Sequence, residues 1–191
     1  MNKKTIIYDT AVSLFASQGY ESTTTLQVAR EVGITEPAVF YHFKNKNTLF
    51  SIILEKALNI YLNRIEKLVL SDRSAFDCLV DLIKVHFMIV AEEPEYARIL
   101  LRAFPAKLED PDNTCTKIYR QVRSALRDAI KVILEAGMTS GEFTDVDVEA
   151  TSNLIIAMIN GLMSLKIAAL DNLEGVETAT IEFCRNALLK H

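Results

Sequence analysis

The chain has 191 residues, of which 50% are hydrophobic and 24% are charged, and its formal net charge is −4. This composition is typical of a folded globular protein and excludes an intrinsically disordered chain. An isoelectric point near 5.5 also excludes a protein that coats nucleic acid with its whole surface. Residues 1–46, however, hold five basic and four acidic side chains, a net charge of +1, whereas the remainder carries −5.

Apolar residues recur at helical spacing along nearly the whole chain, starting with Ile7, Ala11 and Phe15 on one face of a first helix. Gly19 follows where a left-handed helix cap is expected. Two short helical patterns come next, and longer patterns then predict helices at about 46–70, 76–90, 94–104, 114–136, 148–170 and 175–189. Because no alternating strand pattern and no internal repeat accompany them, the sequence predicts an all-α fold of about nine helices.

The two short patterns have the spacing of a helix-turn-helix. Thr24 and Gln27 form a T-x-x-Q capping box that starts a helix at Thr25. Ala29 is small where two helices must cross closely, and Gly33 can adopt the positive φ that a tight turn requires. The second helix of such a pair fits the DNA major groove, although a plain helical hairpin inside a bundle has the same spacing.

On a helical wheel, the second of these helices has an apolar arc and an outward arc. Val39, Phe43 and part of Phe40 fall on the apolar arc, which should face the core. The outward arc comprises Thr35, Ala38, Tyr41 and His42. Such side chains can approach base edges or phosphates, and Pro37 sets the helical φ near the start of the helix. Two basic residues stand beside the N-terminus of the next helix, where N–H groups favour an anion: Lys44 and Lys46.

The stretch "GYESTTTLQVAREVGITEPAVFYHFKNKNTLF" resembles the N-terminal DNA-binding domain of the TetR family of bacterial transcriptional regulators. The resemblance covers Ile6 to about Phe50. It is carried in combination by Gly19-Tyr20, the threonine run, Val28-Ala29, Val32-Gly33-Ile34-Thr35, His42-Phe43, and Lys46 followed by Leu49. Farther along, the helix count and "EAGMTSGEF" resemble the family's variable second domain more loosely. The resemblance implies a DNA-binding domain at 1–46 and a ligand-binding and dimerisation domain at 47–191.

Carried over by position, the resemblance implies three groups of DNA contacts. Thr24 and Thr25 are assigned to a phosphate at the start of their helix. The base-reading end of the next helix is assigned to Thr35, Glu36, Pro37 and Ala38, and backbone or nearby base contacts to Tyr41, His42 and Lys46. One departure is Phe40, where the family usually has a tyrosine whose hydroxyl reaches a phosphate. Tyr41 could supply a partial substitute.

The larger domain supplies candidate ligand contacts. Aromatic side chains at helical spacing are individually more typical of plain core, but together with the resemblance they predict a mostly apolar cavity between helices. Its expected lining is Tyr61, His86, Phe87, Tyr96, Phe104 and Tyr119. The surroundings of His86, "KVHFMIV", favour a hydrogen-bonded core histidine over a ligand or metal role. An apolar or aromatic small-molecule effector is therefore expected.

The last two helical patterns predict a homodimer. Residues 148–170 are apolar on two opposite sides, and such a helix must be covered on both. Residues 175–189 show one strong apolar face, which includes Val176 and Cys184. The expected interface comprises Leu154, Ala157, Met158, Gly161, Leu165, Phe183 and Ala187. An interior helix of a monomer is the alternative, but small residues at 157 and 161 favour close approach of two copies in a four-helix interface.

The sequence gives little support to other functions. It has no glycine-rich phosphate loop, no HExxH pair and no nucleophile motif, so no enzyme activity, cofactor or metal site is predicted. Cys78, Cys115 and Cys184 are widely spaced, which indicates reduced thiols in a cytoplasmic protein. The apolar run 154–170 contains Asn160 and Lys166 and is interpreted as a buried helix rather than a membrane span. No secretory signal is predicted at the N-terminus.

Together these features predict a ligand-responsive homodimeric regulator of the TetR type. It would act as a repressor that a small apolar or aromatic effector releases from near-palindromic double-stranded DNA, although the sequence does not distinguish repression from activation. The alternative is an all-helical small-molecule carrier or adaptor that does not bind DNA. Salt-dependent binding to a promoter fragment would separate the two functions, because phosphate neutralisation makes affinity fall steeply with salt.

Overall fold

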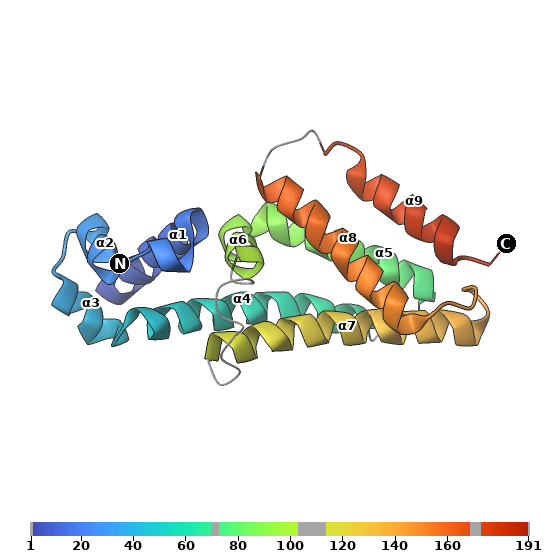
Figure 1. The fold of residues 1–191 in the computed structure, drawn as a ribbon, viewed down its shortest axis with the longest axis horizontal. Coiled ribbons are helices and arrows are strands. Elements are labelled where there is room, and N and C mark those ends of the chain that lie inside the picture. Colours follow the sequence, from blue (N-terminus) through green and yellow to red (C-terminus); the bar gives the residue numbers. More distant parts are fainter. Residues whose placement is uncertain (1, 70–72, 103–113, 169–172, 191) are drawn as a thin grey trace. The chain divides into compact units, whose positions relative to one another are not determined.

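A computed structural model describes residues 2–69, 73–102, 114–168 and 173–190. These ranges are almost wholly helical, and their only β-type pairing is a single bridge between Phe143 and Leu189. They contain nine helices: α1 (Lys3–Ser22), α2 (Thr25–Val32), α3 (Glu36–Phe43), α4 (Lys46–Val69), α5 (Ala75–Glu92), α6 (Pro94–Arg102), α7 (Thr114–Ser140), α8 (Val148–Ala168) and α9 (Val176–Leu188) (Figure 1). The predicted all-α fold is confirmed.

Contacts divide the chain into two compact units. The first consists of residues 1–60 and 93–121, and it contains α1, α2, α3, α6 and the adjoining parts of α4 and α7. The second consists of residues 61–92 and 122–191, and it contains α5, α8, α9 and the remaining parts of α4 and α7. Helix α6 thus belongs to the same unit as the helix-turn-helix, although about fifty residues separate them in the sequence.

In the first unit, α1 packs against α2 and α6, and α2 packs against α3. The ring of Phe15 on α1 lies 4.8 Å from that of Phe50 on α4, and Tyr20 lies 4.7 Å from Phe50 (centroid to centroid). Aromatic pairs of this kind add to the stabilisation that burial provides. They join the end of α1 to the start of α4, next to the helix-turn-helix.

The predicted start and end of α2 are confirmed. The hydroxyl oxygen of Thr24 accepts the backbone N–H of Gln27 at 3.1 Å, and Gly33 closes the helix with φ 73°. Within the described residues, the second bond of a capping box, from the backbone N–H of Thr24 to the side chain of Gln27, does not form. Instead the side-chain amide of Gln27 exchanges hydrogen bonds with that of Gln18 on α1. The box residue therefore ties α2 to α1.

The end of α1 differs from the prediction. Gly19 has the expected positive φ of 84°, but its ψ of 172° is extended, and α1 continues for one further turn to Ser22. That turn is closed by Thr23, whose N–H donates to the carbonyl of Tyr20 at 3.3 Å. Glycine tolerates this backbone because it has no Cβ. Gly19 is thus a break within α1 rather than its cap.

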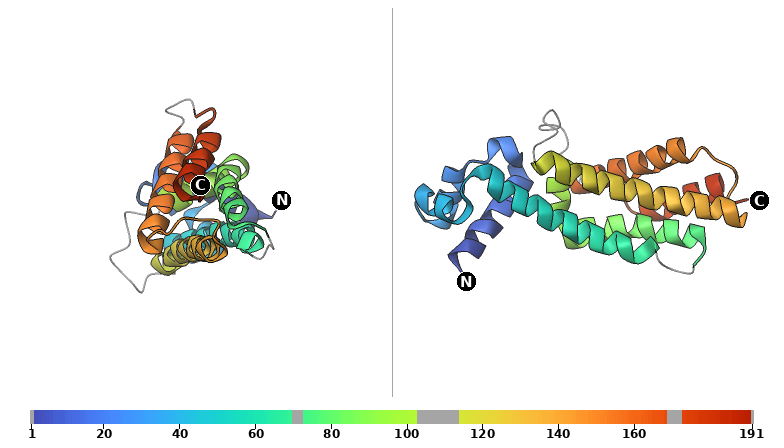
Figure 2. Two further views of the ribbon diagram at one scale, coloured as in Figure 1. Left: turned by 90° about the vertical axis from the view of Figure 1, so that its right-hand side faces the viewer. Right: turned by 90° about the horizontal axis from the view of Figure 1, so that it is seen from below.

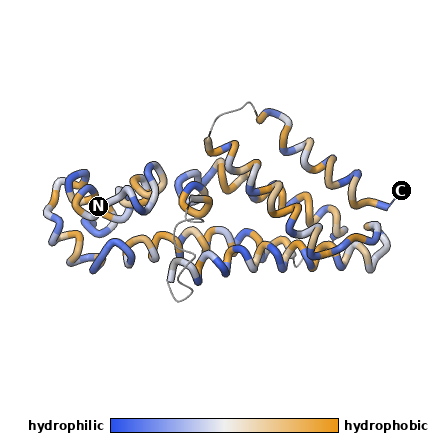
Figure 3. Tube along the Cα trace, in the orientation of Figure 1, coloured by the Kyte–Doolittle hydropathy of each residue, from blue (hydrophilic) through white to orange (hydrophobic). Residues whose placement is uncertain are grey.

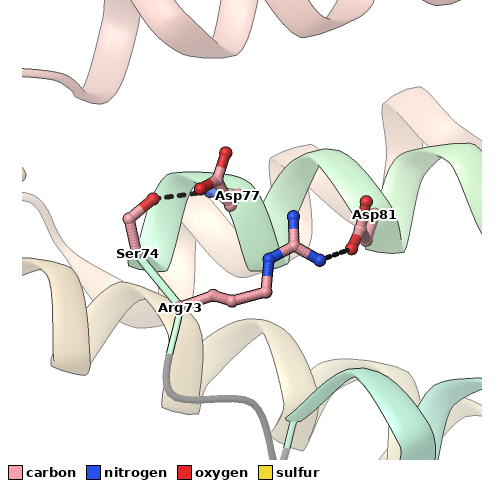
Figure 4. A network of polar contacts seen from close by, with 4 residues as sticks. All are labelled: Arg73, Ser74, Asp77 and Asp81. Atoms are coloured by element: carbon pink, nitrogen blue, oxygen red, sulfur yellow. Dashed lines mark hydrogen bonds and ion pairs between the residues drawn. The ribbon is translucent and has the colours of Figure 1, made fainter.

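In the second unit, α8 and α9 both pack on α5 (Figures 1 and 2). Ser74 caps the start of α5: its hydroxyl accepts the N–H of Asp77 at 3.0 Å, and Arg73 pairs with Asp81 in the next turn (Figure 4). Asp147 caps α8 in the same way through the N–H of Ala150 at 2.9 Å. Both helices begin at short polar side chains that satisfy otherwise unpaired N–H groups.

Helix α7 extends to Ser140, beyond the predicted end near residue 136. The reason is the buried ring of Phe143, which folds back against Gly137 inside the last turns of the helix. Just before this ring, the carboxylate of Glu142 accepts the N–H groups of Ala75 and Phe76, at 2.8 and 3.1 Å. The segment after α7 therefore also caps α5.

The apolar character of α8 is visible along most of its length (Figure 3). Among the described helices, α8 alone is long and apolar enough to cross a membrane, by length and composition only. One side of the helix is buried in the second unit, through Ile155, Ile156, Ile159 and Met163. Its opposite side is open, with 60% of Leu154 exposed. The predicted two-sided apolar pattern is therefore present, with one side covered in the monomer.

Candidate functional site

Helix α3 presents the two arcs that its sequence predicts. Val39 and Phe43 are buried, whereas Tyr41 has 86% of its surface exposed. Phe40 differs from the prediction, because with 40% of its surface exposed it lies mainly on the outward side. His42 is half-buried, and its ring meets that of Tyr41 edge-on at 5.2 Å between centroids. The outward surface of α3 is thus more aromatic than expected.

The threonine at the start of α3 does not cap the helix with its side chain. Thr35 precedes the helix as the N-cap residue, but its side chain makes no capping hydrogen bond. Its backbone carbonyl instead accepts the N–H of Ala38 at 3.0 Å, and Pro37 has no N–H to satisfy. Thr35 is exposed. A hydroxyl in this place can donate to or accept from a DNA group without breaking a helix cap.

The two threonines at the start of α2 are placed differently. Thr24 is exposed and accepts one N–H, so its own hydroxyl proton is not used by the capping bond. Thr25 is half-buried and donates its proton to the carboxylate of Glu36 at 2.6 Å. A hydroxyl has a single proton to donate. The phosphate contact predicted for Thr25 therefore requires this bond to be exchanged, whereas the one predicted for Thr24 does not.

Lys46 has a more interior place than its predicted role requires. Its ammonium donates to the carbonyls of Tyr20 and Thr23, at 2.9 and 3.0 Å. It also lies 4.1 Å from the centre of the Tyr20 ring, within cation–π range. These contacts satisfy carbonyls at the end of α1, where a cation is favoured. Lys46 thus fastens α4 to α1, and its phosphate contact remains a prediction.

Lys44 occupies the sharp turn between α3 and α4. It is exposed, and its backbone has φ 56° and ψ −54°. Among the described residues it is the only one other than glycine with a positive φ. Such a backbone costs on the order of 1–3 kcal/mol and persists where neighbouring bonds hold it. Here the N–H of Lys44 donates to the carbonyl of Phe40 at 2.8 Å, and Asn45 caps α4 through the N–H of Thr48.

The candidate effector residues do not all lie in one unit. Tyr61, His86 and Phe87 belong to the second unit and are buried. Tyr96 and Tyr119 belong to the first unit, where both are half-buried. The hydroxyl of Tyr96 lies 3.3 Å from that of Tyr8 on α1, and burial with this hydrogen bond raises the pKa of Tyr8. Phe104 lies outside the described residues.

Tyr61 and His86 form a polar pair inside the apolar second unit. Nδ1 of His86 lies 2.6 Å from the carbonyl oxygen of Leu82, which can only accept, so this nitrogen carries the proton. Nε2 then accepts the hydroxyl proton of Tyr61 at 2.7 Å. Burial lowers the pKa of His86 to about 4, so the ring is neutral at pH 7. The predicted hydrogen-bonded core histidine is confirmed.

Sequence reasoning missed several polar atoms in the second unit. Within the described residues, three buried side-chain atoms lack a hydrogen-bond partner: Nη1 of Arg64, Nε of Arg127 and Oγ of Ser152. Arg64 also pairs through Nη2 with Glu92 at 2.8 Å. The only signal in the sequence is an arginine within a mostly apolar helix pattern, which is more often a solvated charge. The second unit therefore holds cationic groups besides its aromatic side chains.

Most of the predicted interface residues are open in the single chain. Leu154 and Phe183 have about 60% of their surfaces exposed, at 60% and 59%, and Ala157, Gly161, Leu165 and Ala187 are exposed as well. A Cβ built on Gly161 meets no atom within 4 Å. The apolar face predicted for α9 is only partly covered in the single chain: Cys184 and Leu188 are buried, whereas Phe183 and Ala187 are exposed.

A helix-turn-helix with an exposed polar and aromatic second helix, followed by a larger helical domain, defines the class of DNA-binding transcriptional regulators. The sequence matches the family of bacterial regulatory proteins named after tetR over residues 7–52. It also matches the tetracyclin repressor-like C-terminal domain over residues 72–164. The chain therefore belongs to the TetR family, whose members are transcription regulators rather than enzymes, and the predicted family is confirmed.

Individual relatives are distant but cover most of the chain. The fatty acid metabolism regulator protein of Bacillus subtilis is 24% identical over 158 residues, which span 81% of this chain and 78% of that protein. The uncharacterized HTH-type transcriptional regulator YvkB of the same organism is 28% identical over 146 residues, 74% of each chain. A transcriptional regulator from Saccharomonospora viridis, solved with choline, has a TM-score of 0.83 at 18% identity and 98% coverage of both chains.

Proposed function

We propose that this DNA-binding regulator is a homodimeric repressor that a small effector releases from a near-palindromic operator. The observation that favours operator binding is the outward surface of α3, where Thr35 and Tyr41 are exposed; Thr24, at the start of α2, is exposed as well. Residues 1–46 form the DNA-binding domain in this proposal and residues 47–191 the ligand-binding and dimerisation domain. The protein would act in the cytoplasm, where its DNA target lies.

Selection of bound duplexes from a random pool tests this function. The full-length protein should enrich two half-sites related by a two-fold axis, because a symmetric dimer presents two identical α3 helices. Affinity for the selected duplex should fall steeply with salt: each phosphate contact should lower the logarithm of the association constant by about 0.9 for every tenfold increase in salt concentration. A protein that enriches no sequence, and whose binding shows no salt dependence, would be a small-molecule carrier or adaptor instead.

The proposed dimer rests on the open sides of α8 and α9. Leu154, Leu165 and Phe183 are large apolar side chains that a single chain leaves exposed. Burying apolar surface of this kind contributes about 25 cal/mol for each Å² removed from water, and this contribution opposes the entropic cost of association. Sedimentation at micromolar concentration should show a dimer, and a monomer under those conditions would contradict the proposal.

The proposed effector has an apolar or aromatic body and binds in the larger domain. Tyr61, His86 and Phe87 are buried in the second unit, and the hydroxyl oxygen of Tyr61 can still accept a hydrogen bond after donating its own proton. Tyr61, His86 and Phe87 carry no charge at pH 7 that would pair with a strongly charged effector, and desolvation of an unpaired ion is costly. A thermal-shift screen should therefore favour apolar compounds, and a complete lack of apolar hits would count against this chemistry.

A further inference from the structure

We propose that Glu36 determines operator specificity by accepting a hydrogen bond from the N4 amino group of a cytosine, and that Thr25 holds it in position. This inference rests on the proposed operator binding through α3. Glu36 is the first residue of α3, and residues at the N-terminal end of a recognition helix are the ones that reach base edges. The helix dipole favours an acidic side chain there, although its charge opposes the approach of phosphates.

The geometry shows how the carboxylate is held. The hydroxyl of Thr25 donates to Oε1 of Glu36 at 2.6 Å and so joins the first turn of α2 to the first turn of α3. A bond this short is typical of a hydroxyl that donates to an ionised carboxylate. Both side chains are half-buried, and within the described residues no other hydrogen bond or ion pair holds this carboxylate. Its second oxygen, Oε2, therefore remains to accept a hydrogen bond from DNA.

The chemistry of the major groove selects the base. A carboxylate only accepts hydrogen bonds, and the donors that bases present there are N4 of cytosine and N6 of adenine. In adenine the acceptor N7 lies beside the amino group. A carboxylate that accepts from N6 would bring its oxygens close to N7, and it has no proton to donate to that nitrogen. Cytosine has only a C–H beside N4. Guanine and thymine present acceptors, which repel the carboxylate, so cytosine is the favoured partner.

The charge of Glu36 has a second consequence. A carboxylate near DNA lowers affinity for every sequence through repulsion from phosphates, and only a correctly placed amino group offsets that cost. Specificity then arises from rejection of wrong sites as well as attraction to the right one. If Glu36 served only as a structural tie between α2 and α3, its loss would instead weaken binding to all DNA.

The experiment compares full-length variants in selections from a random duplex pool, followed by titrations on the selected operator and on an unrelated duplex. Glu36→Gln keeps the shape and removes the charge. We expect the preference for one cytosine in each half-site to fall about fivefold or more, with a shift towards adenine, which pairs with an amide. Affinity for the unrelated duplex should rise. Glu55→Gln, at an exposed position on α4 of the same unit, controls for net charge. It should change neither the cytosine preference nor the affinity for the unrelated duplex.

Thr25 is tested as a positioning residue. Thr25→Val removes the hydroxyl at nearly constant shape and should weaken the cytosine preference, whereas Thr25→Ser keeps the hydroxyl and should restore it. Replacing the selected cytosine by 2-pyrimidinone removes the N4 amino group. This replacement should weaken binding of wild type at least about fivefold and of Glu36→Ala much less, because the variant has already lost the contact.

The outcomes separate this inference from the proposed function. If Glu36→Gln keeps its cytosine preference, or weakens both duplexes alike, Glu36 is a structural tie and the inference is wrong while operator binding stands. If wild type selects a motif in which no cytosine preference changes when Glu36 is substituted, the inference is also wrong, and operator binding again stands. If wild type selects no motif at all, the proposed operator binding fails, and the inference fails with it.

Discussion

Replacing Lys46 by methionine decides between two roles for this lysine. The substitution keeps the aliphatic stem and removes the ammonium, which donates to the carbonyls of Tyr20 and Thr23 and lies over the Tyr20 ring. Each hydrogen bond to a charged group contributes about 1.5–3 kcal/mol, but the site is only half-buried and water can replace part of it. We therefore expect a loss of about 2–3 kcal/mol in the free energy of unfolding.

Thermal and denaturant unfolding measure this loss, which should lower Tm by about 4–12 °C for a chain of this size. Lys56→Met, at an exposed position on α4, is the matched control and should leave Tm unchanged. The phosphate role makes a different prediction: wild-type stability, with the salt slope of DNA binding reduced by about 1.8 for the two copies in a dimer. That result would refute a structural role for the Lys46 ammonium.

Four further predictions concern the second unit. Gly137→Ala should destabilise the protein by about 1–3 kcal/mol, because a Cβ there would lie 2.2 Å from the ring of Phe143. Gly161→Ala is the control: its Cβ would meet no atom within 4 Å, so this variant should unfold no more easily than wild type. Gly161→Leu should leave the monomer folded and convert the dimer to monomers in sedimentation. As pH falls from 6.5 towards 4, His86 binds a proton in the unfolded state but stays neutral in the folded state, where it is buried. The free energy of unfolding should therefore fall by about 3 kcal/mol across that pH window. The variant His86→Gln should not show this part of the loss. An effector that weakens operator binding should itself bind more weakly, by the same factor, when operator is present, and equal affinities in the two calorimetric titrations would rule out that compound as an inducer.

The helix-turn-helix could be predicted because its signals are local. The threonine cap, the glycine turn and the proline at the start of α3 each act within a few residues, and all three have the conformations that their chemistry requires. The predicted starts of α4, α7 and α8 agree with the structure for the same reason. Buried positions on α3 follow from the helical period alone. Local propensity and hydrophobic spacing are therefore sufficient for this part of the fold.

Contacts between distant residues could not be predicted in this way. Thr25 and Glu36 are eleven positions apart, and the resemblance assigns both to DNA, yet they bind each other. Lys46 meets carbonyls more than twenty residues before it, because the turn at Lys44 brings α4 back against α1. A helical wheel identifies the side of a helix on which a residue lies. It does not identify which backbone carbonyl another helix will place there.

The position of α6 shows why a division of function by sequence differs from a division by contacts. Residues 93–121 follow the predicted boundary at residue 46, yet they belong to the first compact unit. Helix α6 packs on α1, with hydrogen bonds from Ser13 to Glu95 at 2.6 Å and between Tyr8 and Tyr96. A change in the position of α6 must therefore either move α1 or break these bonds. Since α1 also packs on α2, any effector that displaces α6 acts on the helix-turn-helix through contacts already present in this unit.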